Sequence, residues 1–204
     1  MKAWKYVKPE YAPGALRGVF SIGTPLDYAK LDDDQADELD SARRRTITAL
    51  TITDSEDPAQ AAAMGTARSM GIRLNGVRGD FTFKNFSITR RVHGHALCLC
   101  RDPGNPSFGE KTAIIEIADA HLLGTLLHLN NRVLNSHCSS GPVSYEDVDV
   151  EAQATNDDPP DPFIKGRRFQ CENELRIFWP GRSAKPFLSA PFSPPEGMLT
   201  WINP

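Results

Sequence analysis

The stretch FQCENELRIFWP, residues 169–180, predicts a strand late in the chain with two glutamates at its front. Side chains alternate between the two faces of an extended strand. Glu172, Glu174 and Arg176 are therefore expected on one face, with Leu175 on the other. This pattern is typical of a half-buried strand with a charged, solvated rim. A carboxylate pair is also what charge-stabilising and acid–base chemistry uses, so the same residues form a candidate catalytic site.

The length, composition and net charge limit the number of domains and the kinds of partner that the chain is expected to bind. The chain has 204 residues, 40% of them hydrophobic and 24% charged, which is enough to bury one good core. We therefore expect a single domain over residues 1–204. The formal net charge of -3 gives no reason for general affinity to nucleic acid or to an anionic membrane. It leaves local basic patches open.

The sequence also bears on the compartment. No apolar run is long enough to span a bilayer, and the opening MKAWKYVKPEY lacks the apolar core of a secretory signal. The four cysteines, at positions 98, 100, 138 and 171, are too few for a disulfide framework and fit a reducing compartment. We expect a soluble, cytoplasmic protein, whose export as an effector would need a specialised route.

Hydrophobic patterning predicts an α+β fold, with the helices mostly early and the strands mostly late. Proline and glycine punctuation sets the borders of these segments, and Asp119 stands near the start of the last helix. Helices are expected over residues 31–45, 55–71 and 119–131. Strands are expected over residues 4–7, 18–23, 81–90, 95–100, 112–117, 141–150 and 169–180.

Residues 151–163, EAQATNDDPPDPF, are predicted to form a loop. Three prolines among acidic and small polar residues can sustain neither a helix nor a strand ladder. A loop of this length is usually either functional or a mobile surface excursion, and both interpretations stay open. Its position directly before the glutamate pair favours a function.

Several other chemistries are disfavoured. On a strand, HGHALCLC directs His93 and His95 to one face and Cys98 and Cys100 to the other, so one metal ion cannot reach all four. No metal site is therefore predicted. Dinucleotide, phosphate-loop, HExxH and GxSxG signatures are missing from the sequence. A dispersed Ser/His/Asp or Cys/His site stays open.

The segment ENELRIFWP resembles the ExE signature of the ADP-ribosyltransferase superfamily, in which the second glutamate is catalytic. The opening, WKYVKPEYAPGALRGVFSIGTPLDY, is similar to that of an uncharacterised family often assigned to this superfamily. GPVSYED followed by FIKGRRFQCENELRI resembles that family's V-x-Y, K and F-x-x-E-x-E-x-R run. The resemblance implies a split antiparallel β-sheet core with flanking helices, and NAD as the substrate.

The resemblance also assigns catalytic roles. Glu174 matches the catalytic glutamate, which would stabilise the positive charge that develops on ribose when the bond to nicotinamide breaks. Glu172 would orient or deprotonate the acceptor.

Five further residues are implied to bind NAD. Lys5 would neutralise the pyrophosphate, and Tyr6 or Phe163 would stack on nicotinamide. Ser21 would hold the ribose, and Thr24 completes what remains of the family's Ser-Thr-Ser motif. Lys5 stands where the family usually has Arg or His.

The implied function is ADP-ribosylation of an unidentified macromolecule, expected to be a protein, by a toxin or effector that has a cognate immunity protein. The acidic loop 151–163, which lies where the superfamily has its acceptor-recognition turn, predicts a basic acceptor. Two alternatives stay open. One is an NAD glycohydrolase that uses water as acceptor, and the other is a non-catalytic binding or immunity module on the same fold.

Overall fold

The computed structural model describes residues 1–28, 42–53, 58–73, 79–109, 113–134, 137–153, 159–181 and 187–202. The chain is a mixed α+β protein, in which antiparallel strand pairs predominate. Its elements, in chain order, are β1 (Ala3–Val7), η1 (Pro9–Tyr11), α1 (Ala12–Leu16), β2 (Val19–Ile22), α2 (Pro25–Tyr28), β3 (Ala42–Ile52), α3 (Pro58–Ser69), β4 (Phe81–Arg91), β5 (Gly94–Cys100), η2 (Pro106–Phe108), β6 (Ala113–Ile117), α4 (Ala120–Asn130), β7 (Ser139–Pro142), β8 (Ser144–Glu146), β9 (Asp149–Glu151), β10 (Ile164–Gly166), η3 (Arg167–Glu172), β11 (Glu174–Pro180), β12 (Leu188–Pro191) and β13 (Leu199–Ile202).

The larger part of the molecule, here called the body, is built on a six-stranded sheet of order β13-β6-β1-β5-β11-β7. Every strand pair in this sheet is antiparallel. Helix α4 lies against the sheet, and it approaches β11 so closely that a Cβ at Gly124 would come within 2.8 Å of Ile177 Cγ2. Apolar side chains from the sheet and its helices form the core, among them Leu97, Ile115, Leu123, Leu175 and Trp179.

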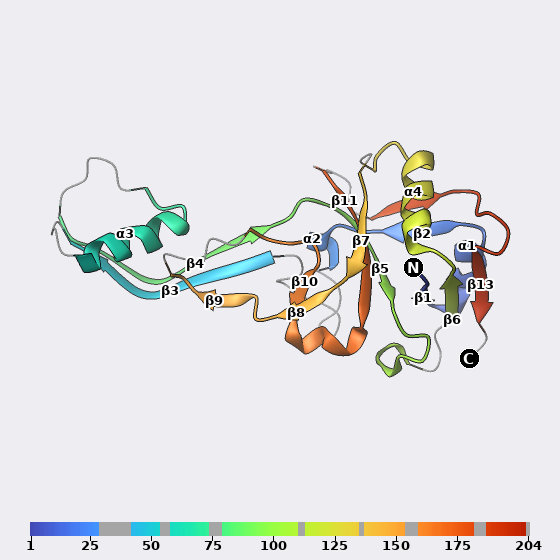
Figure 1. Cartoon of the computed structure of the whole chain (residues 1–204), viewed down its shortest axis with the longest axis horizontal. Helices are drawn as coiled ribbons and strands as arrows, with labels where there is room; N and C mark the ends of the chain where they lie inside the picture. Colours follow the sequence, from blue (N-terminus) through green and yellow to red (C-terminus); the bar gives the residue numbers. More distant parts are fainter. Residues whose placement is uncertain are drawn as a thin grey trace.

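A second part, here called the arm, consists of β3, β4, α3 and β9 and extends away from the body (Figure 1). Strands β3 and β4 have 11 residues each and pair from Ala42 opposite Arg91 to Ile52 opposite Phe81. Strand β9 runs parallel to the first part of β3. The apolar cluster of the arm is small: its buried members are Ile47, Met70 and Ala152.

Most predicted elements are confirmed. The alanine-rich helix begins at Pro58, and Gly71 follows its end with a φ of 76°, a conformation that glycine adopts without strain. Its expected cap at Asp57 lies outside the described residues. Helix α4 follows Asp119, whose carboxylate accepts hydrogen bonds from the backbone N–H groups of His121 and Leu122.

Three predictions about secondary structure are wrong. The helix expected over residues 31–45 does not form at residues 42–45, which begin β3, and its earlier part lies outside the described residues. The early part of the chain therefore contains strands as well as helices. The strand expected over residues 141–150 is divided among β7, β8 and β9, which pair with three different strands. The front of the segment 169–180 forms η3 rather than a strand.

Candidate functional site

The two glutamates are brought together by three elements that meet beside the body's sheet. The parallel pair β8–β10 places Tyr145 directly opposite Lys165. The six residues of the 3-10 helix η3 then carry the chain to Glu172. Asn173, in the left-handed conformation with a φ of 46°, reverses the backbone direction so that β11 starts at Glu174.

Glu174 is the centre of a charged network. Its Oε1 accepts a hydrogen bond of 2.6 Å from Arg176 Nε, and its Oε2 lies 3.4 Å from Lys165 Nζ. The same Lys165 ammonium donates to Glu172 Oε2 at 2.7 Å. The backbone N–H of Glu174 donates to the Tyr145 hydroxyl at 2.8 Å. Lys165 Nζ also lies 4.7 Å from the centroid of the Phe169 ring, within the range of a cation–π interaction.

We call these six residues the carboxylate cluster: Tyr145, Lys165, Phe169, Glu172, Glu174 and Arg176. The charged, solvated rim expected from the sequence is not present, because β11 is buried on both faces from Glu174 to Trp179. The side chain of Glu174 is 3% exposed and that of Arg176 is 0% exposed. Glu172 is the more accessible carboxylate, at 22%. The sequence pattern predicted that Glu174 and Arg176 share a polar face of the strand. It did not predict that this face is buried, because other elements of the chain cover it.

The network fixes the protonation states of its members. Burial by itself raises the pKa of Glu174, but the charges of Arg176 and then Lys165 outweigh it and lower the pKa to about 2. Glu174 is therefore an ionised carboxylate at neutral pH. Burial is the main cause that raises the pKa of Tyr145 to about 12, so this hydroxyl stays protonated.

Lys5, expected to bind pyrophosphate, lies close to the cluster. Its Nζ donates to the backbone carbonyl of Cys98 at 2.9 Å. Burial lowers the pKa of Lys5, and the nearby Cys98 and Glu174 oppose that shift. The ammonium is thus held inside the body near the carboxylate of Glu174.

Tyr6, expected to stack on nicotinamide, already stacks on Phe108, with ring centroids 4.3 Å apart. Its hydroxyl donates to the Asp102 carbonyl at 2.8 Å and accepts from the Asn105 N–H at 3.0 Å. The Asn105 amide in turn donates to the backbone carbonyl of Glu172 at 3.0 Å. Tyr6 therefore supports the loop behind Glu172 and is linked to the cluster through Asn105.

Ser21 and Thr24 lie at β2, which belongs to a separate two-stranded sheet with β12. Ser21 is exposed and pairs opposite Ser189. Thr24 directly precedes the short helix α2, and its hydroxyl donates to the Asp27 carboxylate at 2.6 Å. This end of β2 meets β5 through a bridge between Gly23 and Ala96. The structure therefore places both residues beside β5, outside the contacts of the carboxylate cluster described above.

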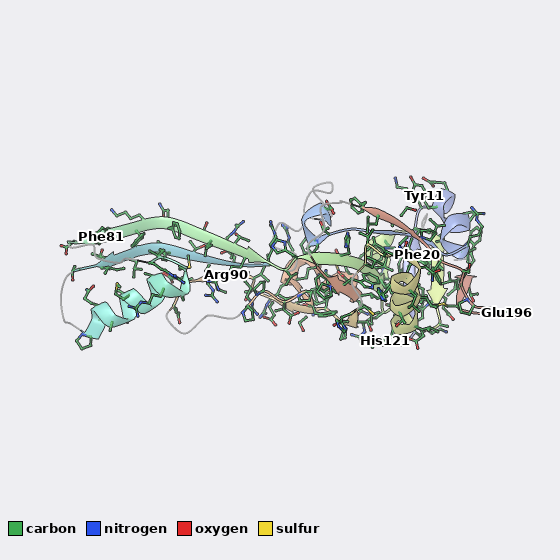
Figure 2. The ribbon with its side chains drawn as sticks, turned by 90° about the horizontal axis from the view of Figure 1, so that it is seen from above. Tyr11, Phe20, Phe81, Arg90, His121 and Glu196 are labelled. Carbon is green, nitrogen blue, oxygen red and sulfur yellow. The ribbon has the colours of Figure 1, made fainter. Side chains whose placement is uncertain are left out.

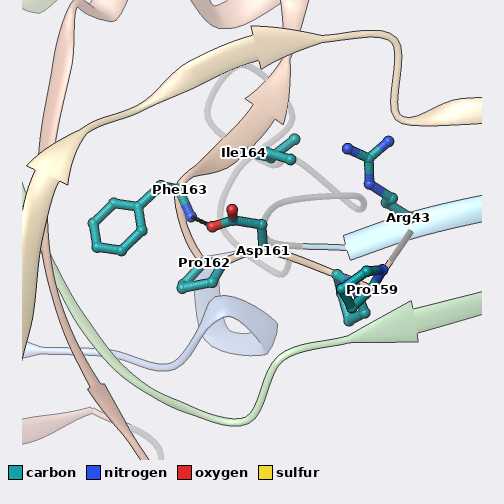
Figure 3. Close-up of a pocket in the computed structure, with 7 residues that line it drawn as sticks. Arg43, Pro159, Asp161, Pro162, Phe163 and Ile164 are labelled. Atoms are coloured by element: carbon teal, nitrogen blue, oxygen red, sulfur yellow. Dashed lines mark hydrogen bonds between the residues drawn. The ribbon is translucent and has the colours of Figure 1, made fainter. Parts of the chain in front are cut away.

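Phe163 lines a pocket of about 460 Å³ together with Arg43, Ile164 and residues 159–162 (Figure 3). The wall of this pocket is connected to the cluster, because Arg176 Nη1 donates to the Pro162 carbonyl at 2.7 Å. Residues 154–158 of the predicted loop, including Asp157 and Asp158, lie outside the described residues. Asp161 is engaged locally, since its carboxylate accepts from the Phe163 N–H at 2.7 Å.

Sequence reasoning assigned no role to Tyr145, Lys165 or Asn105. A sequence feature could have identified Tyr145 and Lys165, because they are the tyrosine and the lysine of the run that resembles the uncharacterised family. No such feature marks Asn105, since it lies in a segment without a regular pattern.

The pairing of β5 with β11 places Cys98 opposite Arg176 and Cys100 opposite Glu174, whereas His95 pairs with Trp179. Within β5, His95 therefore lies on the opposite face to Cys98 and Cys100, as predicted, whereas His93 precedes the strand. Within the described residues, no group of three or more His, Cys, Asp and Glu side chains is arranged to hold a metal ion. No helix in this part of the chain combines the length and apolarity needed to cross a membrane.

Comparison with known proteins gives no match: no protein-family model, curated protein or solved structure is significantly similar to this chain.

Proposed function

We propose that this chain is an ADP-ribosyltransferase that uses NAD and has an ADP-ribosyltransferase-like fold. One observation carries the proposal. The residues of the run that resembles the uncharacterised family, from Tyr145 to Arg176, are separated in the sequence but meet in one network: Lys165 and Arg176 contact the carboxylate of Glu174, Tyr145 contacts its backbone N–H, and Glu172 contacts Lys165. A network of matched charges that keeps one carboxylate ionised and fixed is what charge stabilisation in a transition state requires.

In the proposed reaction, Glu174 stabilises the positive charge that develops on ribose as the bond to nicotinamide breaks. Nicotinamide leaves with the bonding electrons, and the acceptor forms the new bond to ribose. Glu172, the more accessible carboxylate, takes the proton that the acceptor loses. Lys165 keeps the two carboxylates at fixed positions, because its ammonium contacts both.

The described residues fit NAD in part. Lys5 and Phe163 are close to the cluster, and Ser21 is accessible on β2. Tyr6 acts through Asn105, and the hydroxyl of Thr24 is engaged with Asp27. Lys5 and Phe163 are therefore the first residues to examine for contacts with the cofactor. The acceptor is a macromolecule in the transferase, or water in the related NAD glycohydrolase.

A non-catalytic binding or immunity module is the second candidate, and the burial of Glu174 favours it. Both carboxylate oxygens of Glu174 contact a cation, and its side chain is 3% exposed. Under this second candidate, the cluster only stabilises the fold. Under the first, η3 or the loop before β10 must move to admit ribose.

The deciding experiment is incubation with labelled NAD, alone and with a cell lysate, followed by measurement of released nicotinamide and of transferred label. Glu174→Gln should reduce turnover by about 10²–10³-fold, the usual effect of removing one charge-stabilising group. Glu196→Gln, at an exposed position of the body, is the matched control. Circular dichroism and urea unfolding must show that Glu174→Gln is folded, since the change leaves Arg176 and Lys165 without that carboxylate.

A second variant, Glu172→Gln, distinguishes the role of Glu172 from that of Glu174, and it does not remove a fully buried charge. It should slow transfer to the acceptor more than it slows NAD hydrolysis, because only transfer needs a base at the acceptor. Equal loss of both rates would contradict this division of roles. No turnover by the parent chain, or parent-like turnover by a folded Glu174→Gln variant, would support the non-catalytic candidate.

A further inference from the structure

The end of η3, which carries Glu172, is held by a segment that is distant in the sequence. The last carbonyl groups of a helix have no partner within the helix. At η3 these are the carbonyls of Cys171, Glu172 and Asn173, and all three accept hydrogen bonds from residues 100–107. We call residues 100–107 the clamp segment. It contains the end of β5, the loop that follows and the start of η2.

Asn105 makes the central contacts of the clamp segment. Its Nδ2 donates to the carbonyl of Cys171 at 2.8 Å and to the carbonyl of Glu172 at 3.0 Å. A side-chain amide has two N–H groups, which match these two oxygens. Its Oδ1 accepts from the Ser107 N–H at 2.9 Å and so caps η2. Because Asn105 is only 6% exposed, water does not readily replace a hydrogen bond that is lost here.

Three further hydrogen bonds from the clamp segment reach the same carbonyls. They run from Ser107 Oγ to Cys171 at 3.3 Å, from Cys100 Sγ to Glu172 at 3.3 Å, and from the Arg101 N–H to Asn173 at 2.9 Å. Side chains and backbone thus act together on the turn that leads into Glu174. The position of this turn therefore depends on the clamp segment as a unit.

Tyr6 connects the clamp segment to the sheet of the body. It lies on β1, an interior strand that pairs with β5 and β6. Its hydroxyl accepts from the Asn105 N–H and donates to the Asp102 carbonyl, and its ring stacks on Phe108, directly after the clamp segment. A continuous series of contacts therefore runs from β1 through Asn105 to the backbone of Glu172.

We propose that Asn105 is a positioning residue for the Glu172 carboxylate, and that Tyr6 acts through Asn105. This inference rests on the proposed function, because it concerns the group that takes the proton of the acceptor. A general base must lie within hydrogen-bond reach of that proton. The Glu172 side chain is 22% exposed, and two contacts hold it in place: Lys165 on the carboxylate at 2.7 Å and Asn105 on the backbone carbonyl.

The clamp segment affects the two glutamates unequally. Glu174 is buried, and Arg176 and Lys165 contact its carboxylate directly. Loss of the Asn105 amide should therefore disturb Glu172 more than Glu174. In the proposed reaction Glu174 serves both transfer and hydrolysis, whereas Glu172 serves transfer. A change at Asn105 should accordingly slow transfer more than NAD hydrolysis, which a general loss of stability would not do.

The experiment measures both rates for variants of the full chain. Asn105→Ala removes the amide, whereas Asn105→Asp keeps its size and its Oδ1 acceptor and removes only the donor to the carbonyls. Transfer should fall by up to about 10²-fold in both variants, since a displacement of about 1 Å at a catalytic group can have that effect. NAD hydrolysis should change much less. Tyr6→Phe keeps the ring, removes the hydroxyl and should act in the same direction more weakly.

The matched control is Asn131→Ala. Asn131 also donates its side-chain amide to two backbone carbonyls, those of Leu127 at 2.7 Å and Pro191 at 3.3 Å. It follows α4, the helix that carries the His121 labelled in Figure 2. In Figure 1 this helix lies on the upper side of the body, whereas η3 lies on the lower side. The control should lose stability as Asn105→Ala does, but it should keep the parent ratio of transfer to hydrolysis.

A double variant tests whether Asn105 acts through Glu172. Asn105→Ala/Glu172→Gln should transfer no more slowly than Glu172→Gln alone, because the effects of residues that act as one unit are not additive. Additive losses would overturn the positioning role. Equal losses of transfer and hydrolysis in the Asn105 variants, or parent-like transfer by Asn105→Asp, would overturn it as well.

Amide hydrogen exchange separates this inference from the proposed function. Exchange at residues 167–174 should rise in both Asn105 variants and stay at the parent level in Asn131→Ala, whether or not NAD is turned over. Parent-like exchange there in both Asn105 variants would overturn the proposal even for an active enzyme. No turnover, or no transfer, by the parent chain would refute the proposed transferase and with it the role of Asn105 in transfer, while the exchange data would still show whether the clamp segment fixes Glu172.

Discussion

The body and the arm handle their charges in opposite ways. In the body, Arg176 is fully buried and meets the Glu174 carboxylate and the Pro162 carbonyl. In the arm, Arg43 stands directly opposite Arg90 on the neighbouring strand, although like charges in that position destabilise a sheet. The body thus neutralises a buried charge within one strand, whereas the arm keeps two like charges side by side and satisfies each through a different element: Arg43 is ion-paired with Glu146 at 3.1 Å, and Arg90 donates to the Ser69 carbonyl at 2.8 Å.

The body and the arm also differ in the size of their apolar cores. The body's cluster contains twenty buried apolar residues from strands on both sides of β1 and from two helices, but the arm's cluster contains three. Because stability scales with the apolar area removed from water, the body should carry most of the free energy of folding. The arm is then a low-stability extension of a well-packed body.

The largest expected difference comes from removing one arginine in each region. Arg176→Leu should destabilise the protein by about 3–5 kcal/mol, because it leaves the buried Glu174 carboxylate without its closest partner. Arg44→Leu in the arm breaks a half-exposed ion pair with Asp149 and should cost at most about 1 kcal/mol. Urea unfolding of both variants measures the two values.

The double variant Arg176→Leu/Glu174→Leu is the control for this comparison. It removes both charges of the buried pair and should recover much of the lost stability, since apolar replacement of a whole buried pair is often neutral. Similar losses for Arg176→Leu and Arg44→Leu would show that the body's network is solvated, contrary to the structure.

The next largest effect is a loss of folding stability at acidic pH, which comes from Glu174. Because the pKa of Glu174 is lowered from its ordinary value of 4.5 to about 2, its ionised form stabilises the fold fully above pH 4.5. That contribution should disappear as the pH falls from 4.5 to 2.

The measurement is the free energy of unfolding between pH 7 and pH 2 for the parent chain and for Glu174→Gln. The parent should lose more stability than the variant below pH 4.5, since the variant has no carboxylate to protonate at this position. Parallel curves would mean that the pKa of Glu174 is not lowered by folding.

These comparisons also show what the sequence could predict. Helices α3 and α4 were predictable because proline, glycine and aspartate at their borders act locally. The acidic-then-basic pattern of residues 31–45 was misleading, because β4 supplies pairing partners for Arg43 and its neighbours that a helix dipole argument ignores. Pairing between strands that are distant in the sequence outweighed a local electrostatic preference.

Of the carboxylate cluster, the sequence analysis singled out Glu172 and Glu174, from their spacing and from the resemblance. Tyr145 and Lys165 are the tyrosine and the lysine of the run that resembles the uncharacterised family, but no role was assigned to them. Their contacts depend on the parallel pairing of β8 with β10, which leaves no periodic trace in three-residue strands. The burial of Glu174 likewise follows from the elements around β11, so the sequence of β11 alone suggested a solvated rim.

The smallest expected effects come from two asparagines that adopt the left-handed conformation, one in each region: Asn173 with a φ of 46° and Asn85 with a φ of 49°. Asn tolerates this conformation better than other residues with a Cβ, and glycine tolerates it best. Replacement by alanine should therefore cost about 1 kcal/mol at either position, and replacement by glycine only a few tenths.

The region affected should differ between the two variants. Asn173→Ala acts at the turn into Glu174 and should lower the main unfolding transition, whereas Asn85→Ala should raise amide hydrogen exchange in β3 and β4 and leave the body's exchange unchanged. Faster exchange throughout the chain in Asn85→Ala would show that the arm and the body unfold as one cooperative unit.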